Sequence, residues 1–81
     1  KLLLSEGREF QISKDEVVLG RAKDCDLSID DRKASRRNSV IRRQGGRFFI
    51  RDLGSANGTH VNGVKLSDEI PLSSDDIIRI G

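Results

Sequence analysis

The apolar residues along this chain fall in short runs divided by polar turns, a pattern typical of β-strands. Nowhere do they recur at i, i+3, i+4 and i+7 over the roughly ten residues that an amphipathic helix requires. More than half of the Leu, Ile, Val and Phe residues are β-branched, which favours strands. The pattern therefore predicts no helix, and strands at Leu2–Leu4, Glu9–Ile12, Glu16–Leu19, Asp26–Ile29, Ser39–Arg42, Arg47–Asp52, His60–Val61, Val64–Lys65 and Asp76–Ile80.

Turn signals separate these strands at close intervals. Asn62-Gly63 lies between two short valine-bearing runs, and it predicts a two-residue hairpin because both central residues of a type I′ turn need positive φ. Asp75 and Asp76 precede the last apolar run and are typical of a turn. Many short strands at close spacing predict an antiparallel β-sandwich or a small barrel.

Length and composition restrict the chain to one small domain. It has 81 residues with a formal net charge of +2, one Cys and one His, so neither an intrachain disulfide nor an ordinary zinc site is available. No apolar run reaches the roughly 18 residues of a membrane span, and no secretion signal is visible. We expect residues 1–81 to be a single cytoplasmic, intracellular domain, excerpted from a longer protein.

The charge is unevenly distributed. Residues 31–43 hold six basic residues and one acidic residue, whereas residues 66–81 hold four acidic residues and only Arg79 as a basic one. Such a basic segment favours an anionic partner, such as a phosphate group, a polynucleotide or an acidic peptide. A solvated basic face explains the charge equally well at this point.

The sequence offers little equipment for catalysis. His60 lies in a predicted strand with no cysteine or serine motif beside it, and we interpret it as a surface residue. Cys25 lies between Asp24 and Asp26, whose charges disfavour a thiolate, so we interpret it as a small buried apolar residue. Phosphate-binding and nucleophile-elbow motifs are absent from the sequence. We expect no enzyme activity, no metal and no cofactor.

Three loops that follow or precede strands carry polar groups suited to phosphate and peptide binding. Arg21 follows Gly20 at the end of an apolar run, and its guanidinium suits a phosphate or carboxylate. Ser35 offers a hydroxyl within the basic segment. Asn57 can adopt left-handed geometry or bond its amide to an extended backbone.

Three sequence blocks occur in the order and at the spacing of a forkhead-associated (FHA) domain, and the whole chain resembles one. The blocks are Leu19-Gly20-Arg21, Ser35-Arg36-Arg37 followed by Val40-Ile41, and Asp52-Leu53-Gly54-Ser55-x-Asn57-Gly58-Thr59-x-Val61-Asn62-Gly63. The end of the chain is similar to the family's next-to-last strand, so the final strand is expected to lie outside this sequence. The resemblance implies a β-sandwich of two antiparallel sheets with about ten or eleven short strands. It also implies binding of phosphothreonine peptides by loops at one end.

The resemblance assigns roles to individual residues. Arg21 matches the arginine that contacts the phosphate, and Ser35 matches the serine that hydrogen-bonds it. Asn57 matches the asparagine that holds the peptide main chain. Arg36 matches a position that often adds donors, and Lys33 one that can read the third residue after the phosphothreonine. Structural roles in the loops and turns fall to Gly20, Asn38, Gly54, Gly58, Thr59, Asn62 and Gly63.

Two positions depart from the family pattern. Asn38 stands where the family's Ser-x-x-His motif has a histidine that braces the loops, and Ala56 stands where some members place a polar group near the phosphate. An asparagine amide can replace some bracing hydrogen bonds but not the bulk of an imidazole. We therefore expect looser loops and a weakened but functional site.

Two other functions stay open alongside phosphothreonine binding. A divergent FHA domain could bind a protein partner without phosphate, which the departures at Asn38 and Ala56 favour. Nucleic-acid binding rests only on the basic segment, and it lacks the exposed aromatics of single-strand binders because Phe10, Phe48 and Phe49 all lie in predicted strands. We therefore expect a phosphothreonine-containing protein or peptide as the partner, in preference to a nucleic acid, and no membrane.

Overall fold

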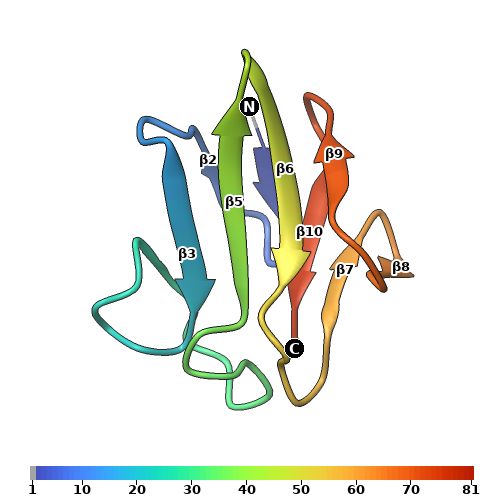
Figure 1. The fold of residues 1–81 in the computed structure, drawn as a ribbon. Coiled ribbons are helices and arrows are strands. Elements are labelled where there is room, and N and C mark those ends of the chain that lie inside the picture. The colour runs from blue at the N-terminus through green and yellow to red at the C-terminus, as the bar shows by residue number, and fades with distance from the viewer. Residues whose placement is uncertain (1) are drawn as a thin grey trace.

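The computed structural model describes residues 2–81, which form two five-stranded sheets packed face to face (Figure 1). Its strands are β1 (Leu2–Leu4), β2 (Glu9–Phe10), β3 (Glu16–Gly20), β4 (Leu27–Ser28), β5 (Ser39–Gln44), β6 (Arg47–Asp52), β7 (Thr59–Val61), β8 (Val64–Lys65), β9 (Ile70–Leu72) and β10 (Ile77–Ile80). One sheet has the order β2-β1-β10-β7-β8, and the other has the order β4-β3-β5-β6-β9. The predicted β-sandwich is confirmed, and no helix occurs within the described residues.

All nine strands expected from the sequence are present, with ends that differ by no more than two residues. The additional strand, β9, contains Pro71 and pairs with β6 at the edge of its sheet. Proline cannot donate to a ladder, so an edge strand is where it is tolerated.

The sheets are mixed, whereas the sequence led us to expect wholly antiparallel ones. β1 runs parallel to β10, and β4 runs parallel to β3 with Leu19 opposite Leu27. In the second case the Asp26 carboxylate accepts a hydrogen bond from the Val18 amide at 2.9 Å, which folds the chain back along the edge of β3. Residues 21–26 alone connect the two strands, and only two residues of each strand pair.

The core lies between the sheets and is built by alternate residues of the central strands. Leu19, Ile41, Ile50 and Ile78 are fully buried and come from β3, β5, β6 and β10. Because successive strand residues point to opposite faces, the intervening positions reach the outer surfaces. This core fixes the strand ends from which the loops leave.

Candidate functional site

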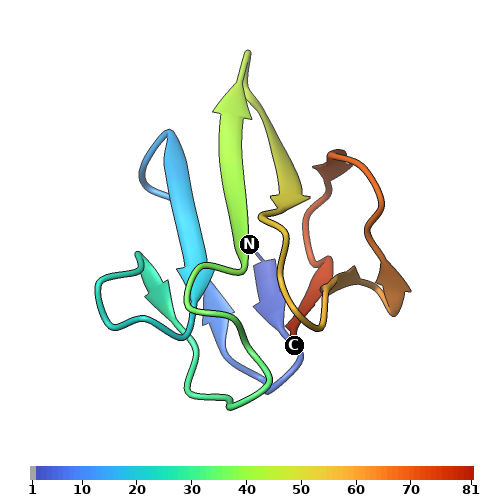
Figure 2. The same cartoon turned by 60° about the horizontal axis from the view of Figure 1, so that its bottom comes forward.

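Three loops gather at one end of the sandwich, as the tilted view in Figure 2 shows. They are the β3–β4 loop (21–26), the β4–β5 loop (29–38) and the β6–β7 loop (53–58). Main-chain hydrogen bonds join the first two: the Arg21 amide donates to the Ser35 carbonyl at 2.9 Å, and the Ala22 amide donates to the Arg36 carbonyl at 3.1 Å. The expected placement of the loops at one end is confirmed.

Gly20 permits this close approach. A Cβ at this position would stand 2.2 Å from the Arg36 carbonyl oxygen, which is backbone and cannot move aside alone. A glycine is therefore required where β3 ends against the β4–β5 loop. Gly20 thus has a structural role, whereas the side chain of Arg21 faces solvent.

Arg21 and Ser35 both keep unused hydrogen-bond donors. The Arg21 side chain is exposed, and its guanidinium has no ion-pair or hydrogen-bond partner among residues 2–81. The Ser35 hydroxyl oxygen accepts a bond from the Ala56 amide at 2.9 Å, while its hydrogen has no acceptor within the described chain. An oriented hydroxyl and a free guanidinium therefore lie on adjoining loops.

The other expected binding residues surround this pair. Arg36 and Lys33 are exposed on the β4–β5 loop, and neither side chain has an ion-pair partner among residues 2–81. The Asn57 amide nitrogen donates to the Lys33 carbonyl at 2.8 Å, which ties the β6–β7 loop to the β4–β5 loop. Asn57 does not adopt positive φ, so the amide alternative is the one realised. Its carboxamide oxygen is left to accept a bond from an added chain.

Asn38 is fully buried and joins the loops through its side chain. Its Oδ1 accepts from the Ser35 amide at 2.9 Å, and its Nδ2 donates to the Thr59 hydroxyl at 3.0 Å and the Gly58 carbonyl at 3.2 Å. The amide thus uses its acceptor and both donors. The expectation of looser loops rested on the missing bulk of an imidazole, and the structure shows that Asn38 makes bracing hydrogen bonds without that bulk.

A buried polar network continues from Asn38 into the β6–β7 loop. Ser39 and Thr59 are fully buried, with their hydroxyl oxygens 2.8 Å apart, and Thr59 donates to Asp52 at 2.7 Å. Because Thr59 gives its hydrogen to the carboxylate, Ser39 is the donor between the two hydroxyls. The chain of bonds links the start of β5 to the end of β6 and the start of β7.

Asp52 organises the β6–β7 loop. Its carboxylate accepts from the Ser55 amide at 2.8 Å and from the Ser55 hydroxyl at 2.6 Å, and that hydroxyl accepts from the Gly58 amide at 2.9 Å. Burial by itself raises the pKa of Asp52, but the hydrogen bonds from Ser55, Thr59 and the Gly54 backbone outweigh burial and lower the pKa. Ser39, Asp52 and Ser55 are not among the site residues that we predict from the sequence. The sequence signal for Asp52 and Ser55 is an Asp followed three positions later by a Ser, which is typical of a side-chain-stabilised turn.

The turn residues take the geometry that the sequence predicted. Asn62 and Gly63 both have positive φ, at 51° and 82°, which confirms the predicted tight turn between β7 and β8. Asn62 also bonds β10, because its Oδ1 accepts from the Ile77 amide at 3.0 Å. In the β6–β7 loop Gly54 and Gly58 have positive φ of 74° and 90°. A residue with a Cβ is strained at each of these glycines.

Much of the basic segment 31–43 is neutralised by acids. Three of its arginines are ion-paired: Arg37 with Asp24, Arg42 with Glu69 and Arg43 with Asp15. The positive charges of the segment that have no ion-pair partner among residues 2–81 belong to Arg32, Lys33 and Arg36, all on the β4–β5 loop. The unpaired positive charge of this segment thus lies at the loop end.

Cys25 and His60 lie outside this arrangement. Cys25 is buried, as expected, and its thiol donates to the Arg36 carbonyl at 3.2 Å. His60 is half-buried on β7, and its Nδ1 is buried without a partner among residues 2–81. Burial lowers the pKa of His60, and the neighbouring Arg79 and Lys65 charges lower it further. The described residues include no group of three or more His, Cys, Asp or Glu placed to hold a metal ion.

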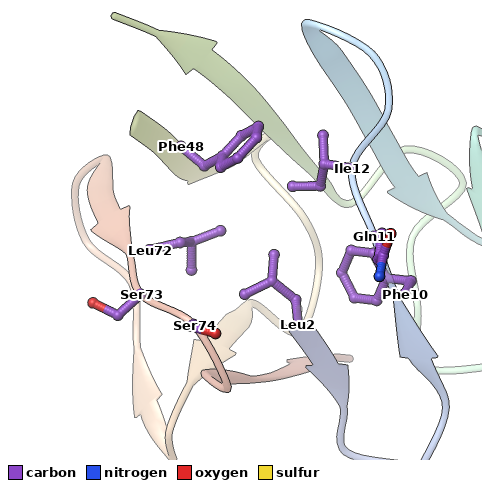
Figure 3. A pocket seen from close by; sticks show the side chains of 8 residues that line it. All are labelled: Leu2, Phe10, Gln11, Ile12, Phe48, Leu72, Ser73 and Ser74. Atoms are coloured by element: carbon purple, nitrogen blue, oxygen red, sulfur yellow. The ribbon is translucent and has the colours of Figure 1, made fainter. Parts of the chain in front are cut away.

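An apolar pocket lies at the opposite end of the sandwich (Figure 3). The side chains of Leu2 and Phe10 from one sheet face those of Phe48 and Leu72 from the other. The remaining lining residues are Gln11, Ile12, Ser73 and Ser74. The pocket has no cationic group in its lining and is separate from the loops that carry Arg21 and Ser35.

The comparison with family models identifies the fold family. The FHA domain model matches residues 17–81, which include all three loops of the site. The chain belongs to the FHA domain family. The resemblance seen in the sequence is therefore confirmed.

Relatives of this FHA domain are regulatory proteins by name. It is 40% identical over 75 residues to the oxoglutarate dehydrogenase inhibitor of Corynebacterium diphtheriae, covering 93% of this chain and 52% of that protein. It is 37% identical to the glycogen accumulation regulator GarA of Mycolicibacterium smegmatis, covering 93% of this chain and 47% of the relative. The chain thus spans about half the length of the curated relatives it matches.

A solved FHA domain structure superposes closely on this chain. It comes from a structural and functional analysis of phosphothreonine-dependent FHA domain interactions. It is 35% identical, has a TM-score of 0.82, and is matched over 95% of this chain and 79% of that one.

No helix within residues 2–81 is long and apolar enough to cross a membrane.

Proposed function

We propose that this FHA domain is a phosphothreonine-dependent peptide-binding module that recruits partner proteins in signalling and performs no catalysis itself. The observation that carries the proposal is the presence, on adjoining loops, of an Arg21 guanidinium and a Ser35 hydroxyl hydrogen that have no partners among residues 2–81. A phosphothreonine brings a charge of about −1.5 to −2 and three acceptor oxygens. Because intracellular kinases make phosphothreonine, the cytoplasm is the compartment where such a module would act.

The loops supply the parts that phosphate recognition needs. Arg21 would give a charge-assisted bond to the phosphate and Ser35 a second, neutral one. Arg36 lies beside them, and Asn57 would accept from the main chain of the peptide through its free oxygen. Lys33 stands next to Asn57 and would contact residues after the phosphothreonine.

The rigidity of the loops favours phosphate-dependent binding over the phosphate-independent alternative. The departure at Asn38 was the main argument for that alternative, and Asn38 makes bonds to Ser35, Gly58 and Thr59. Donors that are already fixed lose little freedom on binding, which favours affinity. Ala56 lacks the polar side chain that some family members place near the phosphate. Its main-chain amide still contributes to the site, because it donates to the Ser35 hydroxyl oxygen and orients that hydroxyl.

Calorimetric titration with the best peptide from a degenerate phosphothreonine library tests the proposal. We expect Arg21→Ala to weaken binding by about 1.5–3 kcal/mol, the range for a hydrogen bond to a charged group. Arg47→Ala removes the same charge at the opposite end of the sandwich and should leave the affinity unchanged. Equal binding of the phosphorylated and unphosphorylated peptides would replace this proposal with the phosphate-independent one.

The phosphoserine version of the same peptide tests selectivity for threonine. Loops that enclose the threonine methyl group would favour phosphothreonine by about 0.8 kcal/mol or more, the value of one buried methyl or methylene. Identical titrations with the two peptides would mean that the loops leave the methyl group in solvent.

A further inference from the structure

Three basic residues stand in a row across the outer face of the β2-β1-β10-β7-β8 sheet. Arg79 of β10 lies directly opposite His60 of β7, and His60 lies directly opposite Lys65 of β8. Directly opposed residues on neighbouring strands share one face of a sheet. Thr59 and Val61, on either side of His60, are buried in the sandwich, so this basic row (Arg79, His60 and Lys65) points outward.

The basic row has no acidic partner within residues 2–81. Neither Arg79 nor Lys65 forms an ion pair there, and the Arg79 guanidinium donates a long hydrogen bond, at 3.3 Å, to the Gly81 carbonyl. The His60 Nδ1 is buried and unbonded. No ion pair within residues 2–81 stabilises this row, in contrast to the ion-paired arginines on the other sheet.

Apolar surface adjoins the row. Ile77 is two residues before Arg79 on the same strand and so shares its face, and its side chain is 44% exposed. Leu3 of β1 lies opposite Ile77 and is half-buried. Protein interfaces combine exposed apolar side chains with arginine in this way. The stem of Lys65 passes close to Gly58, so the row extends toward the β6–β7 loop.

We propose that the basic row and Ile77 form a docking surface for an acidic segment of a partner protein. Carboxylates of that segment would pair with Arg79, His60 and Lys65, and an apolar side chain beside them would cover Ile77. The surface lies on strands rather than on the loops of Arg21 and Ser35, so this inference does not rest on the proposed function. A nucleic acid is a poorer match because its binding depends on neutralising many phosphates, and the row offers three groups beside apolar surface.

Nuclear magnetic resonance titration with an unphosphorylated peptide of glutamate and leucine provides the test. His60 is the one histidine of the chain, so its imidazole signals are unambiguous. We expect shifts at His60, Lys65, Arg79 and Ile77, together with a rise in the pKa of His60 as carboxylates approach. Arg21→Ala should leave this titration unchanged, which separates the surface from the phosphate loops.

Two double variants of equal charge measure the contribution of the row. Lys65→Gln with Arg79→Gln should weaken binding of the acidic peptide at least about threefold, as expected for two partly exposed ion pairs. Arg47→Gln with Arg51→Gln removes the same charge from the other sheet and should leave the affinity unchanged. The shift map of the unmodified domain tests the surface even if a double variant fails to fold.

Three results would overturn the inference. Shifts confined to residues 21–37 would place acidic binding in the phosphate loops. Equal weakening by both double variants would show an effect of net charge alone. Displacement of the peptide by an oligonucleotide of matched charge, with shifts at the same residues, would assign the surface to nucleic acid.

Discussion

Asn38 shows how one buried residue can hold two loops in place. Its amide joins the Ser35 amide to Gly58 and Thr59, and its own main-chain carbonyl accepts from the Leu53 amide at 2.9 Å. Each group that it satisfies is a buried or half-buried polar group, which would cost free energy if left unbonded. Asn38 therefore stabilises the position of Ser35, although it has no role in contacting phosphate.

This geometry changes the expected effect of Asn38→His. The sequence alone favours a gain from restoring histidine, but the larger ring would have to enter a fully buried site among Ser39, Gly58 and Thr59. Overpacking costs roughly 1–3 kcal/mol. We expect Asn38→His to lower both the melting temperature and the affinity for phosphothreonine peptide.

Asn38→Ala and Asn57→Ala form a matched pair for the same measurements. Asn38→Ala leaves buried donors and acceptors unbonded and should lower the free energy of unfolding by about 1–3 kcal/mol or more. Asn57 is exposed, so Asn57→Ala should weaken peptide binding with little effect on unfolding. Similar unfolding curves for the two variants would contradict a bracing role for Asn38.

The site residues differ in how far the sequence reveals them. Arg21 was predicted because it follows an apolar run and Gly20, and Ser35 because it offers a hydroxyl within the basic segment. Both side chains suggest phosphate binding by their own chemistry. The resemblance assigned Asn38 a structural role in the loops, but its partners Gly58 and Thr59 were not predicted, because they are 20 and 21 residues away along the chain. Local pattern contains no information about such a contact.

At the level of elements, short apolar runs and turn chemistry predicted most of the fold. β5 and β6 contain the apolar runs Val40-Ile41 and Phe48-Phe49-Ile50, and they are joined by Gly45-Gly46, which both have positive φ. β9 was missed because it has three residues and a central proline, a combination that single-sequence pattern reads as a loop. The parallel β1–β10 pair joins opposite ends of the chain, and strand periodicity does not determine such partners.

The β6–β7 loop should make stability dependent on pH through Asp52. Hydrogen bonds lower the folded-state pKa of this carboxyl below its unfolded value of about 3.9. A depressed pKa contributes stability above the unfolded value and loses it as the pH falls through the folded value. We expect Asp52→Asn to be less stable than the natural sequence at pH 7, and the difference to narrow progressively below about pH 4.

Denaturant unfolding between neutral and acidic pH measures this difference. The ion-paired Asp26 and Glu69 also have lowered pKa values, from the bonds of Lys14 and Arg42 respectively, but both contribute equally to the two proteins. Asp68→Asn removes the same charge from an exposed residue and serves as the control. A constant gap between Asp52→Asn and the natural sequence at every pH would show that the Asp52 bonds do not depend on its charge.

At the scale of the whole molecule, a small core supports a polar site at one end. The fully buried apolar side chains are Leu19, Ile41, Ile50 and Ile78, and each stands on a strand near the middle of a sheet. Marginal stability of about 0.05–0.15 kcal/mol per residue means that one core truncation is a large fraction of the total. Because the loops leave the ends of these strands, site geometry depends on the core although no core residue reaches the ligand.

Ligand binding should therefore raise the stability of the whole domain. A phosphothreonine peptide at a hundredfold excess over its Kd adds about 2.7 kcal/mol if only the folded state binds. For a domain of this size that corresponds to a rise in melting temperature of roughly 10–20 °C.

Ile41→Ala should lower stability by about 2–5 kcal/mol, and the peptide should recover part of that loss because the loops reform when the core does. Thermal melts of the natural sequence and of Ile41→Ala, with and without peptide, provide the measurement. As a control, Arg21→Ala should show a much smaller rise in melting temperature at the same peptide concentration. An equal rise with the unphosphorylated peptide would mean that the stabilisation does not come from phosphate recognition.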